Sequence, residues 1–319
     1  MQRFIWTARA RRSVGVNTQH SVEESILKYA ADIGSLGPVT IVGSRTQWDV
    51  GGLPSPGSRE IRAPAGVWSH QPEEMTVRCG AGTSIRELNE ECSRFGQMVP
   101  FDLNPEATVG GALAVGRSGF RRLRYGHIRD LVLQIRHVDH SGLLVTSGGP
   151  TVKNVSGYDL CRLLVGSLGK LGCIAEVTLR CLPIPETTLW LTGTGDPFEI
   201  YDELYRPPSI LWDGDQVWVG LEGVKSDVES QAALLKLDRT DSPPPFPEGG
   251  RRSLEPKALR GLVERSEGWL AEIGVGVVHY TTAQAPEPLS DANKRLMTEL
   301  ECRLDPRGRL NPGRQLVAT

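Results

Sequence analysis

Glycine gathers in three segments of this 319-residue chain: IVGSRTQWDVGG (41–52), NPEATVGGALAVGRSG (104–119) and GSLGKLG (166–172). Because glycine has no Cβ, such segments let the backbone turn tightly and approach a ligand closely. The first follows an apolar run typical of a buried strand, and the N–H groups of Gly43 and Ser44 could converge on an anion there. A plain strand-to-loop turn is the alternative. The pattern predicts a loop-rich binding scaffold rather than a helical bundle.

The glycine segments do not match the common nucleotide-binding motifs. None places G-x-G-x-x-G between a strand and a helix with an acidic residue about 20 positions further on. GSLGK is not a P-loop either, because Leu164 stands where that motif requires glycine and Leu171 where it requires a hydroxyl residue. A nucleotide triphosphatase is therefore disfavoured. Thr108 in the second segment adds a hydroxyl donor, which suits a flat ligand lying against the backbone.

Charge, apolar runs and cysteine spacing exclude several classes of function. The net charge of -2 gives no reason to expect a nucleic-acid partner. No apolar run reaches the roughly 20 residues of a membrane span, and the N-terminus lacks the apolar core of a secretory signal. The cysteines lack the tight spacing of zinc or iron–sulfur sites, so we expect no metal and reduced core thiols. These features favour the cytosol, with association at a membrane only through partner proteins.

Hydrophobic periodicity predicts an α+β chain. We expect a helix from residue 18 with Val22, Ile26 and Tyr29 on its apolar stripe, and strands at 39–43 and 75–79. A helix over 83–95 would be capped by Thr83. Further expected elements are a hairpin turning at 139–142, a helix over 158–165, a strand from 172, helices near 197–205, 225–238, 256–272 and 289–302, strands at 215–223 and 275–280, and a mobile Pro-rich loop at 240–250.

These segments in order, together with RYGHIRDLVL, KNVSGYD and DPRGRLNPGR, resemble the FAD-binding flavoproteins of the vanillyl-alcohol oxidase type, also called PCMH-type. Within them the chain most resembles the FAD-binding E subunit of bacterial glycolate oxidase. The resemblance covers roughly residues 18–185 and 301–315. It implies an FAD-binding domain at 1–185, with two α+β subdomains at about 1–105 and 106–185. A small α+β cap domain at 186–300 and a C-terminal return at 301–319 would complete the fold.

The resemblance also implies which residues contact FAD. The first loop would hold the pyrophosphate, the second segment would run along the flavin and ribityl chain, the third would touch the adenine end, and Asn311 would approach the isoalloxazine. A histidine that attaches FAD covalently in some members is absent from Arg45, Thr46 and Gln47, so we expect non-covalent FAD. The expected cofactor-binding residues are Val42, Gly43, Ser44, Arg45, Thr46, Thr108, Gly110, Gly111, Ser118, Gly119, Gly169, Gly172, Cys173, Ile174 and Asn311. Lys170 is expected to be exposed.

The catalytic residues are open at this stage. His279 and Tyr280 are weak candidates for a proton-handling pair, and core packing is the alternative for both. The arginines of the run 121–129 could form a solvated face, a docking surface for another subunit or a phosphate contact. Relatives that oxidise hydroxy acids directly carry a histidine-rich motif in the cap domain, and residues 186–300 have none.

Three functions remain open. The first is a glycolate-oxidase-like FAD-binding subunit that passes electrons from a 2-hydroxy acid to a partner flavoprotein and an iron–sulfur subunit. The second is a free-standing FAD-dependent oxidoreductase of a small hydroxylated substrate. The third is a non-catalytic assembly subunit on a flavin-binding fold.

Overall fold

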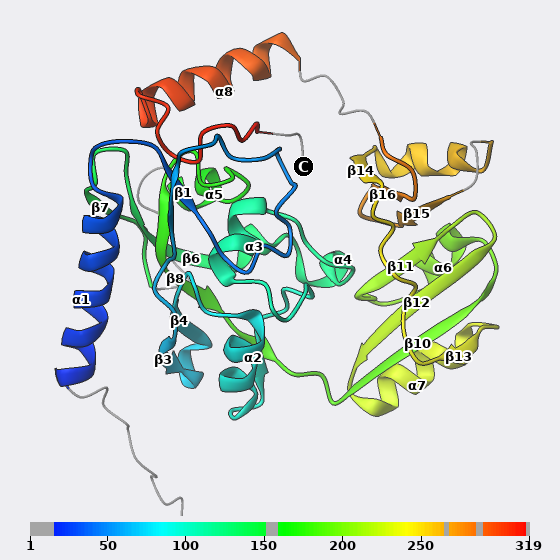
Figure 1. Ribbon diagram of the computed structural model, residues 1–319. Coiled ribbons are helices and arrows are strands. Elements are labelled where there is room, and N and C mark those ends of the chain that lie inside the picture. Colours follow the sequence, from blue (N-terminus) through cyan, green and yellow to red (C-terminus); the bar gives the residue numbers. More distant parts are fainter. Residues whose placement is uncertain (1–15, 151–158, 265–267, 285–289, 317–319) are drawn as a thin grey trace, which may run out of the picture.

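The computed structural model describes residues 16–150, 159–264, 268–284 and 290–316. Within these residues the chain is built around two separate antiparallel sheets (Figure 1). One has five strands in the order β3-β4-β8-β6-β7, and the other has seven in the order β13-β10-β12-β11-β15-β16-β14. Helices accompany both sheets, so the predicted α+β class is confirmed.

The five-stranded sheet carries the larger core. Its strands are β3 (Val67–Gln71), β4 (Thr76–Gly80), β6 (Val132–Val138), β7 (Leu144–Gly148) and β8 (Cys173–Arg180). β6 and β7 form the predicted hairpin, whose turn is closed by a hydrogen bond from Asp139 N to Leu143 O. β8 lies at the centre and is buried along nearly its whole length, because helices cover both faces of the sheet.

α1 (Val16–Ile33) covers one face, and its predicted stripe of Val22, Ile26 and Tyr29 is buried. It ends at Gly34, whose φ of 56° suits glycine. On the other face lie α2 (Ile85–Ser93), α3 (Val109–Val115) and α5 (Leu160–Leu164). The predicted cap of α2 is wrong by one residue. Ser84 Oγ accepts from Glu87 N, whereas Thr83 bonds to the backbone of Gly66.

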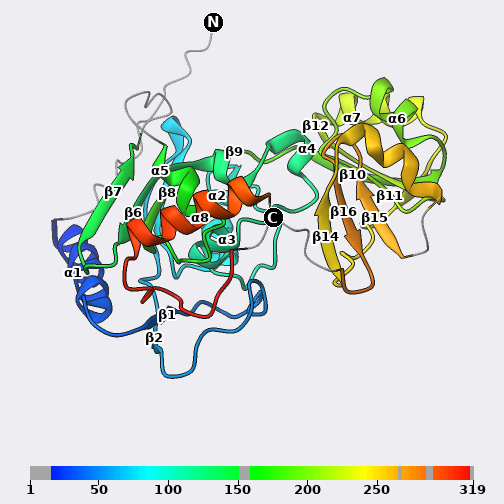
Figure 2. The ribbon, with the colours of Figure 1, turned by 90° about the horizontal axis from the view of Figure 1, so that it is seen from above.

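The C-terminal segment returns to the start of the fold (Figure 2). α8 (Asp291–Leu304) crosses the first part of the chain, and Leu310 then bridges Val39 of β1 (Val39–Ile41), which pairs in parallel with β2 (Arg59–Ile61). Val39 N donates to Arg309 O, and Asn311 N donates to Val39 O. Residues that precede the seven-stranded sheet in the sequence and residues that follow it therefore pack together in one unit.

The seven-stranded sheet has a hydrophobic core of its own. Its strands are β10 (Thr187–Thr194), β11 (Ser209–Trp212), β12 (Gln216–Gly223), β13 (Asp238–Thr240), β14 (Gly250–Ser253), β15 (Trp269–Glu272) and β16 (Val277–Tyr280). It is accompanied by α6 (Pro197–Glu203), α7 (Lys225–Leu234) and the 3-10 segment η3 (Pro256–Glu264).

The predicted helix over 256–272 is wrong in its second half, where β15 lies instead. All four residues of β15 are buried between β11 and β16, and Trp269 packs edge-on against Trp212. Gly268 has a φ of 94°, which stops a helix from continuing through it. Burial and strand pairing therefore override the local helical pattern.

Several short elements lie between the larger helices and strands. They are the 3-10 turns η1 (Pro72–Glu74) and η2 (Ile128–Leu131), the pair β5 (Gln97–Met98) and β9 (Leu182–Pro183), and α4 (Arg122–Tyr125). Asp159 caps α5, since its carboxylate accepts from Arg162 N. Lys153 and Tyr158 of the KNVSGYD motif lie outside the described residues. Five of the cysteines are buried free thiols, as expected, but Cys302 is exposed on α8.

Candidate functional site: a glycine-lined cleft

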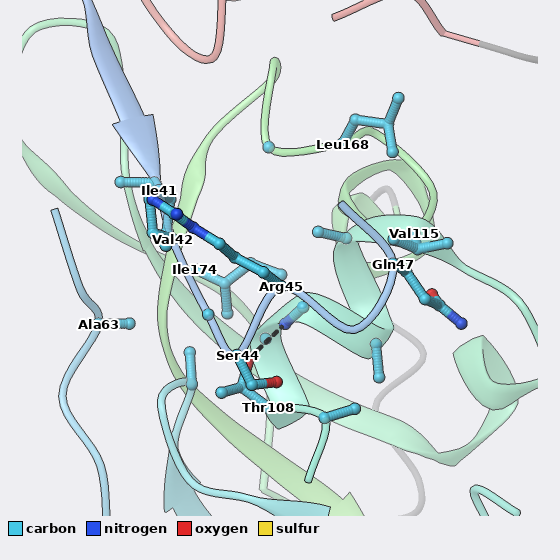
Figure 3. Close-up of a pocket in the computed structure, with 18 of the residues that line it drawn as sticks. Ile41, Val42, Ser44, Arg45, Gln47, Ala63, Thr108, Val115, Leu168 and Ile174 are labelled. Carbon is cyan, nitrogen blue, oxygen red and sulfur yellow. Dashed lines mark hydrogen bonds between the residues drawn. The ribbon is translucent and has the colours of Figure 1, made fainter. Parts of the chain in front are cut away.

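An open cleft of about 940 Å³ lies where three segments meet (Figure 3). One is the loop after β1, the second is α3 with the residues before it, and the third is the turn at 168–169 with the start of β8. Among the described residues, the lining contains Arg45 and Arg314 but no acidic side chain. Such a lining suits a large ligand that carries negative charge.

The loop after β1 presents backbone donors without acceptors. Val42 N donates to Ile61 O, which ties the loop to β2, and Arg62 donates to Gly43 O. Within the described part of the chain, however, the amides of residues 43–47 donate to no protein acceptor. Arg45 has a φ of 60°, a left-handed conformation that turns the backbone sharply within this run. Consecutive unpaired amides in such a turn form an anion-binding concavity.

The loop after β1 is held in place by packing against the start of α3. Thr108 caps α3, because its Oγ1 accepts from Gly111 N. A Cβ on Gly43 would lie 2.4 Å from the same Oγ1, so only glycine lets the loop pass this close. Ser44 and Thr108 accordingly lie together in Figure 3. Gly110 is needed for packing within the protein, because a Cβ at this position would lie 2.7 Å from the Cβ of Ala81.

Arg314 fixes the far end of the loop. Its guanidinium donates to the carbonyl oxygens of Trp48, Val50 and Gly52, with 2.8 Å to Val50 O. Trp48 lies between two guanidinium groups, 4.7 Å from Arg45 and 4.6 Å from Arg314. Burial lowers the pKa of Arg314. The C-terminal segment thus holds the loop in shape through charged hydrogen bonds and cation–π contacts.

Asn311 joins two walls of the cleft. Its Oδ1 accepts from Ile41 N at 2.9 Å, and its Nδ2 donates to Leu168 O at 3.0 Å. Both polar ends of the side chain are therefore occupied within the protein. Leu168 (φ 52°) and Asn311 (φ 44°) are left-handed like Arg45, so three of the six non-glycine residues with positive φ in the described part of the chain line the cleft. Backbone strain of this kind concentrates at functional sites.

The structure brings together all but three of the predicted cofactor-binding residues in this one cleft. The three exceptions lie in the protein packing around it. Ser118 Oγ accepts from Ile128 N, a Cβ on Gly119 would lie 2.0 Å from Asp102 O, and one on Gly172 would lie 2.5 Å from His137 Cδ2. Lys170 is not exposed as expected, because it pairs with Glu301 of α8 at 2.8 Å.

Sequence reasoning missed Gln47, Trp48, Leu168 and Arg314 as cleft residues. Two signals for them were present in the sequence. Arg314 closes the NPGR motif that supplied Asn311, and Gln47 and Trp48 directly follow the predicted loop. Leu168 lies between the glycines of the third segment, and no sequence pattern distinguishes it from an ordinary core leucine.

The predicted catalytic candidates do not line the cleft. His279, on β16, is buried, and its Nε2 lies 2.7 Å from Glu272 Oε1. Its ring packs against Phe246 of the Pro-rich tract, which stacks on Phe120 of the first part with ring centroids 3.5 Å apart. Tyr280 is half-buried at the edge of the second core. His279 therefore lies at the seam, meaning the contact between the residues that follow α3 and the β14–β16 edge of the seven-stranded sheet.

The arginine run bridges the two parts of the chain, which corrects all three expectations for Arg121 and Arg124. Arg121 pairs with the buried Glu222 of β12 at 2.9 Å, and Tyr125 Oη donates to the same carboxylate at 2.6 Å. Arg124 donates to Glu222 O. These contacts fasten α4 to the seven-stranded sheet.

Two further arginines at the seam have no counter-charge bound to them. The side chains of Arg117 and Arg251 make no hydrogen bond or ion pair with another described residue, and the Nε atom of each is buried. Burial lowers the pKa of Arg251 most, Glu272 opposes this, and Arg117 and Arg122 add to it, so that the pKa is about 10. Burial, Arg122, Arg129 and Arg251 also bring the pKa of His127 down to about 4. The seam is therefore electropositive.

Known proteins resemble this chain in sequence and in fold. Residues 24–148 match the family described as FAD binding domain. Alkyldihydroxyacetonephosphate synthase aligns with a TM-score of 0.63 at 15% identity over 92% of this chain and 74% of that one. Berberine bridge enzyme aligns with a TM-score of 0.50 at 19% identity over 66% of this chain and 47% of that one. Residues 24–148 therefore match an FAD-binding domain, which agrees with the FAD-binding resemblance seen in the sequence, and these solved structures share the fold.

Curated relatives cover parts of the chain. Glycolate oxidase subunit GlcE of Escherichia coli K12 is 32% identical over 62% of this chain and 59% of its own length. D-lactate dehydrogenase of Archaeoglobus fulgidus is 42% identical over 33% of this chain and 24% of its length. Glycolate oxidase subunit GlcD of Bacillus subtilis is 42% identical over 36% and 25%. The matches thus span at most about three fifths of these relatives.

No helix among the described residues has the length and apolar character to cross a bilayer.

Proposed function

We propose that this chain is an FAD-dependent oxidoreductase subunit that takes electrons from a small 2-hydroxy acid and passes them to a partner protein. The relatives named above as glycolate oxidase subunits and a D-lactate dehydrogenase support this substrate class. The observation that carries it is the seam, where the partly buried Arg117 and Arg251, whose side chains form no ion pair with another described residue, lie beside the His279–Glu272 pair. A 2-hydroxy acid carries a carboxylate, which could pair with the arginines. It also carries a hydroxyl group, whose proton the histidine could accept.

We assign the cofactor to the glycine-lined cleft. The unpaired amides of residues 43–47 would hold the pyrophosphate, and the lining without acidic groups favours its negative charge. The residues along α3 and the turn at Gly169 would carry the rest of the cofactor. Bound FAD supplies the redox chemistry by accepting a hydride equivalent from the carbon that bears the hydroxyl group.

We propose that FAD is held without a covalent bond. The first loop offers Arg45, Thr46 and Gln47, and none of them is a nucleophile suited to attacking a flavin. Cys173 does line the cleft, but burial raises its thiol pKa to about 12. Because the thiolate is the reactive form, this cysteine is inert near neutral pH.

The substrate groups are assigned to the seam. Arg251 and His279 are directly opposite each other on β14 and β16, so their side chains share one face of the sheet. Arg251, with Arg117, would bind the carboxylate. Glu272 at Nε2 would orient the imidazole so that Nδ1 accepts the hydroxyl proton. Phe120 and Phe246 cover the histidine, which would keep water away from it.

This assignment uses the proposed division into an FAD-binding domain at 1–185, a cap domain at 186–300 and a C-terminal return at 301–319. The cap domain contributes Arg251 and His279, and the FAD-binding domain contributes the cleft and Arg117. The partners we propose are a larger flavoprotein and an iron–sulfur protein, which would receive the electrons.

The test begins with the purified full-length chain and added FAD. We expect a yellow protein whose flavin is released by acid precipitation, and anaerobic bleaching of that flavin by glycolate or D-lactate. Arg251→Met should slow bleaching at least 10-fold at low substrate concentration and leave FAD uptake unchanged. Arg239→Met, an exposed arginine on β13 of the same sheet, should change neither.

The other two functions give different results. Sustained turnover of the purified chain with a small-molecule electron acceptor, in the absence of any partner protein, would favour a free-standing oxidoreductase. A chain that takes up no FAD would favour an assembly subunit. Bleaching that is insensitive to both Arg251→Met and His279→Gln would contradict the assignment of the seam.

A further inference from the structure

A second cluster of chemically competent side chains lies away from the cleft and the seam. It comprises His70 of β3, Cys92 near the end of α2 and Cys181 just after β8. One ligand atom from each lies within 4.8 Å of the other two. Both thiols are fully buried, and none of the three residues lines the FAD cleft. Figure 1 shows α2 beside β3 and β4, which brings these distant residues together.

The spacing of the three atoms matches metal coordination. Cys92 Sγ lies 3.9 Å from Cys181 Sγ, which lies 4.0 Å from His70 Nε2. In a tetrahedral zinc site, bond lengths of about 2.3 Å to sulfur and 2.0 Å to nitrogen separate two sulfurs by roughly 3.8 Å, and sulfur from nitrogen by roughly 3.6 Å. These two distances exceed the ideal values by only a few tenths of an ångström, and the third pair, Cys92 and His70, lies within 4.8 Å, so a small movement of one side chain would complete the geometry.

A disulfide fits the same residues less well. The two sulfurs would have to approach from 3.9 Å to about 2.05 Å, a movement of almost 2 Å inside a close-packed core. Metal binding requires far less rearrangement. The presence of a histidine within reach of both thiols is also unnecessary for a disulfide but expected for a metal.

Gln97 is in position to supply a fourth oxygen ligand. Its Nε2 donates to Pro72 O at 2.7 Å, which directs Oε1 toward His70 Nε2 at 3.0 Å. If the metal takes Nε2, this oxygen loses its hydrogen-bond donor and is left facing the ion. Gln97 is itself buried, and the ring of Phe95 packs edge-on against His70. The cluster is thus enclosed and almost complete in its coordination.

We propose that His70, Cys92 and Cys181, with Gln97 as the fourth ligand, bind one Zn²⁺ ion. Binding releases the two thiol protons to solvent, so two thiolates and one divalent ion form a neutral complex. Neutrality suits this position, because an uncompensated charge in the core would be costly. The ion would join β3, α2 and the end of β8 and so stabilise the folded chain. His70 Nδ1 has no described partner, which should weaken binding about 10- to 100-fold relative to a complete outer shell.

The experiment is a titration of the reduced full-length chain with Co²⁺, which replaces Zn²⁺ in such sites and gives intense sulfur-to-metal absorption. We expect saturation at one equivalent, loss of the band when Zn²⁺ is added, and a rise in melting temperature with Zn²⁺. Cys92→Ser and Cys181→Ser should each abolish the band. Cys161→Ser, a buried cysteine elsewhere, should retain it.

His70→Gln guards against variants that fail to fold, because His70 is less buried than the thiols. It should weaken Co²⁺ binding at least 10-fold while FAD uptake stays at the wild-type level. No absorption band in the wild-type chain, or an undiminished band in both serine variants, would overturn the proposal. So would a Cys92–Cys181 disulfide recovered from protein purified under reducing conditions.

Discussion

Asn311 offers the sharpest test of how the cleft is held together, because one side chain bridges its two walls. Asn311→Ala removes the acceptor of Ile41 N and the donor of Leu168 O. Each buried group left without a partner costs about 1–3 kcal/mol, so we expect a loss of about 2–4 kcal/mol in the free energy of unfolding. For a chain of this size that corresponds to a fall in melting temperature of roughly 3–6 °C.

Two companion variants separate the contributions. Asn311→Gly loses the same hydrogen bonds but accepts the φ of 44° freely, so it should be about 1 kcal/mol more stable than Asn311→Ala. Asn311→Asp keeps the size and the acceptor for Ile41 N, but it turns a carboxylate oxygen toward Leu168 O. It should therefore be as destabilised as the alanine variant.

Urea unfolding measures the stability of these variants, and titration with FAD measures their affinity for the cofactor. We expect the dissociation constant for FAD to rise at least 10-fold in all three, because the loop after β1 and the turn at Leu168 lose their common support. An Asn311→Asp chain with wild-type stability and FAD affinity would refute the reasoning, since it would show that the bridge to Leu168 contributes nothing.

Three further predictions concern the surroundings of the cleft. Gly169→Ala forces an L residue to a φ of 70° at the lining and should weaken FAD binding more than Lys170→Ala, which removes only a partly exposed ion pair; equal affinities in a fluorescence titration would contradict this. His127 has a folded pKa of about 4, so the unfolded chain binds a proton near pH 6.5 that the folded chain refuses, and stability should fall between pH 6.5 and pH 4. His127→Asn keeps an acceptor for Arg129 N and should show a smaller loss between pH 7 and pH 5 in urea unfolding; identical losses would exclude His127 as a source. Arg121→Met leaves the Glu222 carboxylate buried without its cation and should cost about 3 kcal/mol, more than Glu222→Gln, and calorimetry giving the reverse order would contradict the described pairing.

The part of the site that sequence predicted is the part encoded locally. The loop at 42–46 and the capped turn at Thr108 depend on glycines and hydroxyl groups placed within a few residues of each other. The fold class and the stripe of α1 followed from periodicity for the same reason. Such features require only that neighbouring residues agree with one another.

The missed features depend on contacts between distant residues. The sandwich of Trp48 between Arg45 and Arg314, and the bridge from Arg121 to Glu222, join positions that no local pattern connects. The strand β15 was taken for helix because its pairing with β11 and β16 is invisible in a window of ten residues. Gly172 was expected at the cofactor because the resemblance places the third glycine segment at the adenine end, whereas close packing against His137 requires a glycine there.

The path of the chain explains how the cleft and the seam are held in fixed positions relative to each other. The chain leaves the five-stranded sheet after β9, builds the seven-stranded sheet, and returns through α8 to pair Leu310 with Val39. Arg309 then donates to the carbonyl oxygens of Ile33, Gly34 and Gly37, which locks this return beside the start of the cleft. The seven-stranded sheet is attached by the chain crossing after β9, by the Arg121–Glu222 pair and by the stacking of Phe246 on Phe120. Three attachments restrict its rotation far more than one linker would, so the position of Arg251 and His279 relative to the cofactor cleft is a property of the folded chain itself.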